Sequence, residues 1–252
     1  MSESQIVKVD QGGVNARILA KEAKADFRRV EAASLKMPTR FTSAEGKRFF
    51  ARLFNTLQLN THFISVIART RLDHEDVAKI EDIIRSQMDT VTENLNKAID
   101  DAETLFKAHG ITSTATYDTV PLDMDVHVLS SIGRRFLEVL GKLDQLMPLL
   151  QTLEIHEVIT TQTVDIQRAS LKRQVRDVAN GARNFAMGLR RRMNVMAARD
   201  GGDRSEERRQ RGAATDVANE VNVQQSEVDA TLDPSATKFS GSLEDIGSSG
   251  DD

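Results

Sequence analysis

The sequence contains 252 residues, of which 39% are hydrophobic, 29% are charged and none is cysteine. A chain of this length can bury one sizeable core or two small ones. The lack of cysteine excludes disulfides, thiolate metal sites and cysteine nucleophiles, and it fits a reducing compartment. No basic start followed by an apolar run opens the chain, and no window approaches the roughly 18 apolar residues that span a bilayer. We therefore expect a cytoplasmic protein with no membrane partner.

Charge is distributed unevenly along the chain, although the net charge is only -4. Residues 1–40 carry 8 basic and 5 acidic side chains, and residues 41–163 carry 12 basic and 18 acidic ones. Residues 164–200 reverse this balance with 9 basic and 3 acidic side chains, whereas residues 201–252 carry 5 and 12. A basic segment at 164–200 therefore lies between an acidic body and an acidic tail.

Residues 1–40 are a basic N-terminal segment in which the pattern predicts a helix over 15–35. Its apolar positions recur at spacings of three and four, at Leu19, Ala23, Phe27 and Val30. We expect Met37-Pro38 to end this helix, because proline moves the residue before it out of the helical region.

Residues 41–110 predict a helical hairpin. Thr42 or Ser43 can cap the first helix, and Asp73 can cap the second, which ends where Gly110 supplies a left-handed residue. The second helix would be roughly 50 Å long at 1.5 Å per residue, so it must pack lengthwise against another long helix. That partner can come from the same chain or from a second copy.

Residues 111–199 predict one strand followed by two helices. The strand alternates apolar residues with polar ones or proline, and its apolar positions are Val120, Leu122, Met124, Val126 and Val128. No other segment alternates comparably, so a second copy of the same strand is the expected partner, and this indicates a homodimer.

The two helices that follow begin at about Ser131 and Thr163, and Pro148 should break or kink the first of them. After residue 199 the sequence turns to glycine, serine and charged residues, so we expect 200–252 to be a disordered acidic tail. The predicted fold class is mainly α: long helices with one short β-strand and a disordered C-terminal tail.

No motif for catalysis or metal binding occurs in the sequence. His74-Glu75 and His156-Glu157 each resemble half of a zinc-peptidase motif, but Ala78 and Thr160 stand where the second histidine would be needed. We therefore expect no enzyme activity, no cofactor, no metal and no small-molecule substrate.

The last predicted helix carries most of the basic segment. Its cationic residues are Arg168, Lys172, Arg173, Arg176, Arg183, Arg190, Arg191 and Arg192. Lys172, Arg176 and Arg183 share one face at helical spacing, where they could neutralise phosphates of a nucleic acid. The alternative is that these cations only pair with the acidic surface of 41–163 or with the acidic tail.

A family resemblance favours the first interpretation. Its points are the proline-containing strand before a helix in TVPLDMDVHVLSSIGRRF, Leu143-Asp144 in that helix, and the Arg173-x-x-Arg176 spacing before Gly181. In these features the stretch from Thr116 to Arg192 is similar to the AcaB-like family of conjugative plasmids and integrating conjugative elements. The resemblance implies a dimeric transcriptional regulator of transfer genes with a ribbon-helix-helix type of DNA-binding unit, in which one strand from each protomer enters the major groove.

In such a unit the base-reading candidates are Thr114, Thr116 and Thr119, because Asp123 and Asp125 on the strand would repel phosphates. The basic residues of the last helix would position the protein on the backbone of the duplex. The sequence thus predicts a homodimeric regulator that binds double-stranded DNA, with activation or repression left open. The alternative is a helical adaptor or scaffold that binds another protein through the 73–108 helix and makes no nucleic-acid contact.

Overall fold

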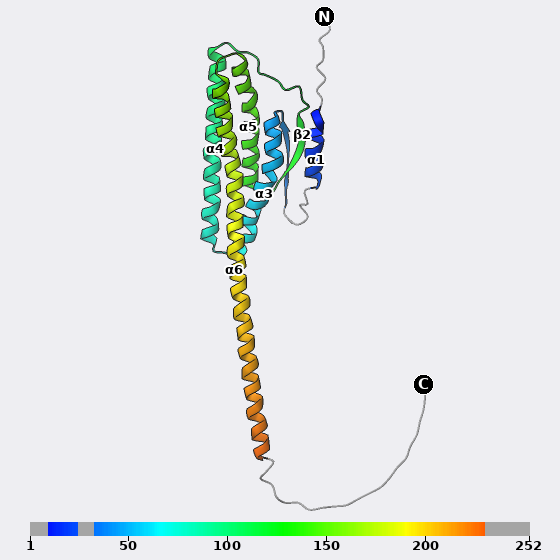
Figure 1. The fold of residues 1–252 in the computed structure, drawn as a ribbon, viewed down its shortest axis with the longest axis vertical. Helices are drawn as coiled ribbons and strands as arrows, with labels where there is room; N and C mark the ends of the chain where they lie inside the picture. The colour runs from blue at the N-terminus through cyan, green and yellow to red at the C-terminus, as the bar shows by residue number, and fades with distance from the viewer. Residues whose placement is uncertain (1–9, 25–32, 230–252) are drawn as a thin grey trace, which may run out of the picture. The chain divides into compact units, whose positions relative to one another are not determined.

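The structure is a computed structural model that describes residues 10–24 and 33–229, the part beyond residue 199 by its backbone alone. It divides into a first unit that reaches Val195 and a second unit that begins at Met196. In its described part, the second unit is the continuation of the last helix. The first unit is mainly helical with a small two-stranded sheet, as the sequence predicts (Figure 1).

The first helix is shorter in the described residues than the predicted 15–35 segment. A short turn, η1 (Gln11–Gly13), precedes α1 (Val14–Lys24). Ile18 is buried, and Lys21 donates a hydrogen bond from Nζ to the carbonyl of Ala51. The predicted apolar positions Phe27 and Val30 lie outside the described residues.

The sheet corrects the prediction about the strand's partner. β2 (Leu122–Val128) pairs antiparallel with β1 (Leu35–Phe41) of the same chain, so no second copy is needed to satisfy it. Sequence reasoning missed β1 because it treated Pro38 only as a helix terminator. Pro38 lies opposite Asp125, and a two-stranded sheet tolerates proline wherever its missing N–H would face away from the partner strand.

A nearly continuous helical segment follows β1. It consists of α2 (Ala44–Phe49), η3 (Phe50–Phe54), α3 (Asn55–His62), η4 (Phe63–Ile67) and η5 (Ala68–Thr70), of which η3 and η4 are wider π-type turns. Ser43 is the N-cap, as predicted, and its hydroxyl accepts a hydrogen bond from the Gly46 N–H at 2.9 Å.

The long helix finds its lengthwise partner within the chain. α4 (His74–Ala108) begins after the N-cap Asp73 and ends before Gly110, which has a φ of 65°, and both boundaries agree with the prediction. Its apolar side packs along α5 (Ser131–Ile155), and Arg135 of α5 forms an ion pair with Asp89. The sequence left open whether the lengthwise partner of α4 comes from the same chain or from a second copy. The structure shows that it comes from the same chain.

The last helix differs from the sequence expectation, and at Pro148 of α5 the break, one of the two expected outcomes, does not occur. α5 continues through Pro148 without a break. α6 (Thr161–Asp229) continues as helix well past residue 199, where the composition predicted disorder. About half of residues 200–229 are alanine, arginine, glutamate or glutamine, which are good helix formers. Residues 230–252 of the predicted tail lie outside the described residues.

The core lies between α5 and the elements around it. Aromatic rings connect the sheet to the helical segment, since the ring centroids of Phe41 and Phe50 are 5.2 Å apart and those of Phe50 and Phe54 are 5.4 Å apart. The inner face of β2 contributes Leu122, Val126 and Val128, which are all buried. Within the described ranges, no helix has the length and apolar content that crossing a membrane would need.

Candidate nucleic-acid interface on the last helix

Six basic side chains lie along one side of α6 and define what we call the cationic face: Lys172, Arg173, Arg176, Arg183, Arg190 and Arg191. At 3.6 residues per turn they fall within about a third of the helix circumference. The opposite side packs into the core through Val175, Val178, Ala182 and Leu189, all of which are buried. The apolar side thus fixes the rotation of α6 and turns the cations outward.

Most of the cationic face is exposed to solvent and not neutralised within the fold. Arg173, Arg176, Arg183, Arg190 and Arg191 are exposed, and Lys172 is partly buried. Among the residues that the structure describes, Arg176, Arg183 and Arg191 have neither an acidic partner nor a hydrogen bond. The described part of the fold therefore does not match the alternative in which every cation of this helix pairs with the acidic surface of 41–163.

Two members of the cationic face have neighbours that leave their charge accessible. Arg173 lies 3.8 Å from Asp177, but both side chains are largely exposed, at 81% and 64%, so solvent screens this pair. The guanidinium carbon of Arg190 lies 4.3 Å from the centroid of the Phe63 ring, a cation–π contact that connects α6 to η4.

Arg168 and Arg192 make contacts with other helices of the fold and are not part of the cationic face. Arg168 donates to the Gln151 side-chain oxygen at 3.0 Å and to the Met147 carbonyl at 3.4 Å, and its Nε is buried. Arg192 points to the α4 side of the helix, where it pairs with Asp76 at 3.2 Å. The sequence could not separate these two arginines from the others, because their partners come from helices that are distant in the sequence.

The three threonines proposed for base reading precede the strand that should carry them. Thr114, Thr116 and Thr119 lie in the connection between α4 and β2, which runs along α5, where the Ala115 N–H donates to the Thr152 hydroxyl at 2.7 Å. Thr114 and Thr116 are exposed, and Thr119 is partly buried. Because β2 pairs with β1, the structure does not place these threonines on an intermolecular ribbon.

The segment that carries the three threonines comes near α6 through Tyr117. Burial raises the pKa of Tyr117 to about 12, and the nearby charges of Glu45, Arg168 and Asp144 also act on it. This places Tyr117 near Arg168, whereas Arg183 lies fifteen residues further along α6, about 22 Å away at 1.5 Å per residue. The segment that carries the threonines thus comes near α6 at Arg168, which lies about one helical turn before Lys172 of the cationic face.

A feature that the sequence did not single out is a pair of adjoining hollows between α4 and α6, with volumes of 480 and 320 Å³. Both are lined by Asn94 and Gln174, whose side chains are hydrogen-bonded to each other at 2.8 Å. Ile166 lines the larger hollow and is 63% exposed. The side chains that the structure describes contain no group of three or more histidine, aspartate or glutamate residues placed to bind a metal ion.

Comparisons with known proteins find a similar fold among solved structures. No protein-family model matches the chain, and no curated protein matches it. Among solved structures, the chain is similar to the crystal structure of selenomethionine-containing AcaB from uropathogenic E. coli, with a TM-score of 0.57 and 22% sequence identity. The match covers 68% of this chain and 86% of that chain, and at this identity it shows a shared fold.

Proposed function

We propose that this protein is a regulator that binds double-stranded DNA, and that the cationic face of α6 supplies its contacts to phosphates. The observation that carries the proposal is the exposure of Arg176, Arg183 and Arg191 without an acidic partner among the described residues. Unpaired surface arginines bind phosphate oxygens and release the counterions condensed on the duplex. The shared fold with AcaB supports regulation as the role, and the resemblance noted between Thr116 and Arg192 is the reason to propose conjugative transfer genes as the target.

The length of the cationic face fits a duplex. Lys172 and Arg191 are nineteen positions apart, which corresponds to about 28 Å along the helix axis. One turn of B-form DNA rises about 34 Å, so one protomer could contact phosphates over most of a turn. Thr114 and Thr116 remain the proposed base contacts because they are exposed and belong to the segment that comes near α6 at Arg168. A homodimer on two half-sites stays part of the proposal, although the pairing of β2 within the chain removes the strand-based argument for it.

The test is a salt titration of binding, read by fluorescence anisotropy of a labelled duplex of about three helical turns. We expect affinity to fall steeply with salt. The double variant Arg176→Ala with Arg183→Ala should reduce the slope of log affinity against log salt by about two, because each lost phosphate contact contributes roughly 0.9. Sequencing of captured genomic fragments then identifies preferred sites, and the mass of the protein in solution reports the oligomeric state.

The matched control is Lys79→Ala with Arg134→Ala, which removes the same charge from two cations outside the cationic face. Lys79 of α4 and Arg134 of α5 both form exposed ion pairs, with Glu75 and Glu138, and neither belongs to the cationic face, so this variant tests the effect of lost charge away from that face. Equal losses in the two double variants would show only a dependence on net charge. A protein that fails to bind DNA even at low salt would contradict the proposal.

A second candidate function is binding of a helical protein partner, and the hollows between α4 and α6 favour it. The apolar line of α4 is buried against α5, so a partner could use only the remaining side of α4, where Asn94 and Gln174 line both hollows. The variant Asn94→Arg should abolish capture of such a partner and leave DNA affinity unchanged. Loss of DNA affinity in this variant would argue against two separate surfaces.

A further inference from the structure

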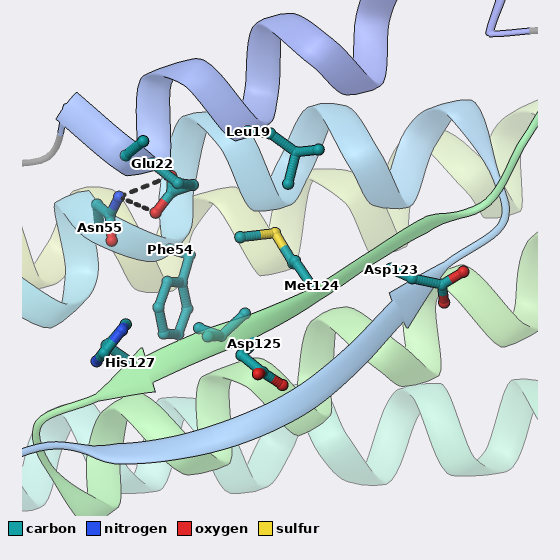
Figure 2. A pocket seen from close by; sticks show the side chains of 10 residues that line it. Leu19, Glu22, Phe54, Asn55, Asp123, Met124, Asp125 and His127 are labelled. Atoms are coloured by element: carbon teal, nitrogen blue, oxygen red, sulfur yellow. Dashed lines mark hydrogen bonds between the residues drawn. The ribbon is translucent and has the colours of Figure 1, made fainter.

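A cavity of 350 Å³ lies between α1 and the edge of β2 that β1 does not occupy (Figure 2). Its lining comes from three parts of the chain: Leu19, Glu22 and Ala23 of α1, Phe54 and Asn55, and residues 123–127 of β2. Cavities of this size can hold small ligands or a few residues of a peptide. The chemistry of the lining shows which of these fits best.

The β2 edge directs backbone hydrogen-bonding groups toward this cavity. Gln58 donates to the carbonyl of His127 at 2.9 Å and accepts from the N–H of Leu129 at 3.0 Å, so these residues point away from β1. In an antiparallel pair the direction alternates from one residue to the next, so the N–H and C=O groups of Asp123 and Asp125 point the same way. The position of Pro38 opposite Asp125 agrees, because proline has no N–H to donate across the pair.

Among the residues that the structure describes, both ends of this edge are occupied and its middle is open. Gln58 occupies one end, and at the other end the Asn15 side chain donates to the carbonyls of Val120 and Pro121 at 2.9 and 3.2 Å. Between these two amide side chains, the backbone groups of Asp123 and Asp125 have no hydrogen-bond partner in the part of the chain that the structure describes. An extended backbone edge with free donors and acceptors is what a further strand would pair with.

The cavity favours a ligand that donates hydrogen bonds and carries positive charge. The Asn55 side-chain nitrogen donates to both carboxylate oxygens of Glu22, at 2.8 and 2.9 Å, and this fixes the orientation of the amide. The other atom of that amide, Oδ1, is buried and has no donor among the described residues. The lining contains the carboxylates of Glu22, Asp123 and Asp125 but no lysine or arginine, and the nearby Arg40 makes only an exposed, solvent-screened pair with Asp123 at 3.7 Å.

We propose that this gap in the β2 edge binds a short extended peptide carrying a lysine or arginine. Its backbone pairs with the N–H and C=O groups of Asp123 and Asp125, as an added strand does. Its basic side chain reaches the Glu22 carboxylate, which Asn55 holds in place through the two hydrogen bonds drawn in Figure 2. The apolar walls of Leu19, Phe54 and Met124 receive the neighbouring part of the peptide. This binding does not depend on the DNA-binding proposal, because the cavity lies away from α6.

The test uses the full chain labelled with nitrogen-15 and the peptide acetyl-Val-Lys-Val-amide. We expect the backbone amide signals of Asp123 and Asp125 to shift on titration and their N–H groups to gain protection from hydrogen exchange. The variant Glu22→Gln keeps an acceptor for Asn55 but removes the charge, and it should weaken binding by about tenfold, since hydrogen bonds between charged groups are stronger than neutral ones. Asp165→Asn removes an exposed carboxylate from α6 and is the charge-matched control, with no expected effect.

Three further measurements separate the proposal from its rivals. Ala23→Phe should fill the cavity and prevent binding without changing charge. Acetyl-Val-Glu-Val-amide should bind at least tenfold more weakly than the lysine peptide, by the same charge argument. Butylamine alone should leave the amide signals of Asp123 and Asp125 in place. The proposal is overturned if butylamine reproduces the full shift, if both peptides bind equally, or if the shifted signals lie elsewhere in the protein.

Discussion

The carboxylate of Asp144 lies directly against the α-carbon of Gly46. A Cβ atom built at position 46 would lie 2.8 Å from the Cγ of Asp144, so no side chain fits there. Asp144 accepts hydrogen bonds from the backbone N–H and the hydroxyl of both Thr42 and Ser43, at 2.6 to 3.0 Å. This buried carboxylate therefore connects the middle of α5 to the start of α2, and Gly46 provides the space that it needs.

Gly46→Ala should destabilise the protein by about 2–4 kcal/mol. The added methyl group would displace the Asp144 carboxylate, which combines overpacking with the loss of hydrogen bonds to buried donors. The free energy of unfolding from urea titration measures the effect. Gly141→Ala is the matched control in α5, because no atom lies within 4 Å of a Cβ built there. We expect this control to stabilise the protein by about 0.5–1 kcal/mol through helix propensity. A similar effect of both substitutions would contradict the proposed contact.

Substitutions of Arg168 and Arg183 should affect different properties: the first should lower stability, and the second should weaken DNA binding. Arg168→Met removes the hydrogen bond to Gln151, so we expect a loss of about 1 kcal/mol in stability and an unchanged salt dependence of DNA affinity. Arg183→Ala alters an exposed residue, so stability should change by less than about 0.5 kcal/mol while the salt slope falls by about one. Urea titration and fluorescence anisotropy on the same protein samples measure both quantities. The reverse pattern would show that the cationic face is assigned to the wrong arginines.

The parts of the fold that depend on local sequence could be predicted. The caps Ser43 and Asp73 and the stop at Gly110 agree with the structure, because capping depends on residues only a few positions apart. The face of α6 that carries Arg176 and Arg183 also follows from helical spacing alone.

The parts that depend on distant contacts could not be predicted in this way. β1 and β2 are separated by the whole of α2 to α4, and Pro38 concealed the alternation of β1. The continuation of α5 beyond Pro148 is a further case, because α5 packs along α4, a contact that the local sequence around Pro148 does not show. The burial of Arg168 and the cavity beside Glu22 also arise only when separate elements pack, and no sequence motif signals either of them.

Tyr117 should give the protein a distinctive loss of stability at high pH. Burial, with the nearby Glu45 carboxylate, raises the pKa of Tyr117 from 10.0 to about 12, against the opposing effect of Arg168. A folded-state pKa above the unfolded value means a stabilising contribution that is complete below pH 10 and lost as pH rises toward about 12.

The comparison of the wild-type protein with Tyr117→Phe isolates this effect. Between pH 10 and about 12 the urea midpoint of the wild-type protein should fall more steeply than that of the variant, because phenylalanine has no proton to lose. Burial lowers the pKa of Lys47 below its ordinary value of 10.5, so this group makes the protein more stable as pH rises toward 10.5. The contribution is the same in both proteins and cancels in the comparison. Parallel curves for the two proteins would contradict the assignment.

Gln58 should be among the least replaceable polar residues of the first unit. It is fully buried, and its amide bonds both the carbonyl of His127 and the N–H of Leu129. Gln58→Leu would keep the volume but leave two backbone groups without partners, so we expect a loss of about 2–4 kcal/mol in the free energy of unfolding. Gln145→Leu, at an exposed position of α5, should change stability by less than about 0.5 kcal/mol. Because Gln58 accepts a hydrogen bond from the N–H of Leu129, Gln58→Leu should also increase hydrogen exchange at Leu129 more than elsewhere in the sheet. An equal increase across the whole sheet would show that Gln58 contributes only its volume.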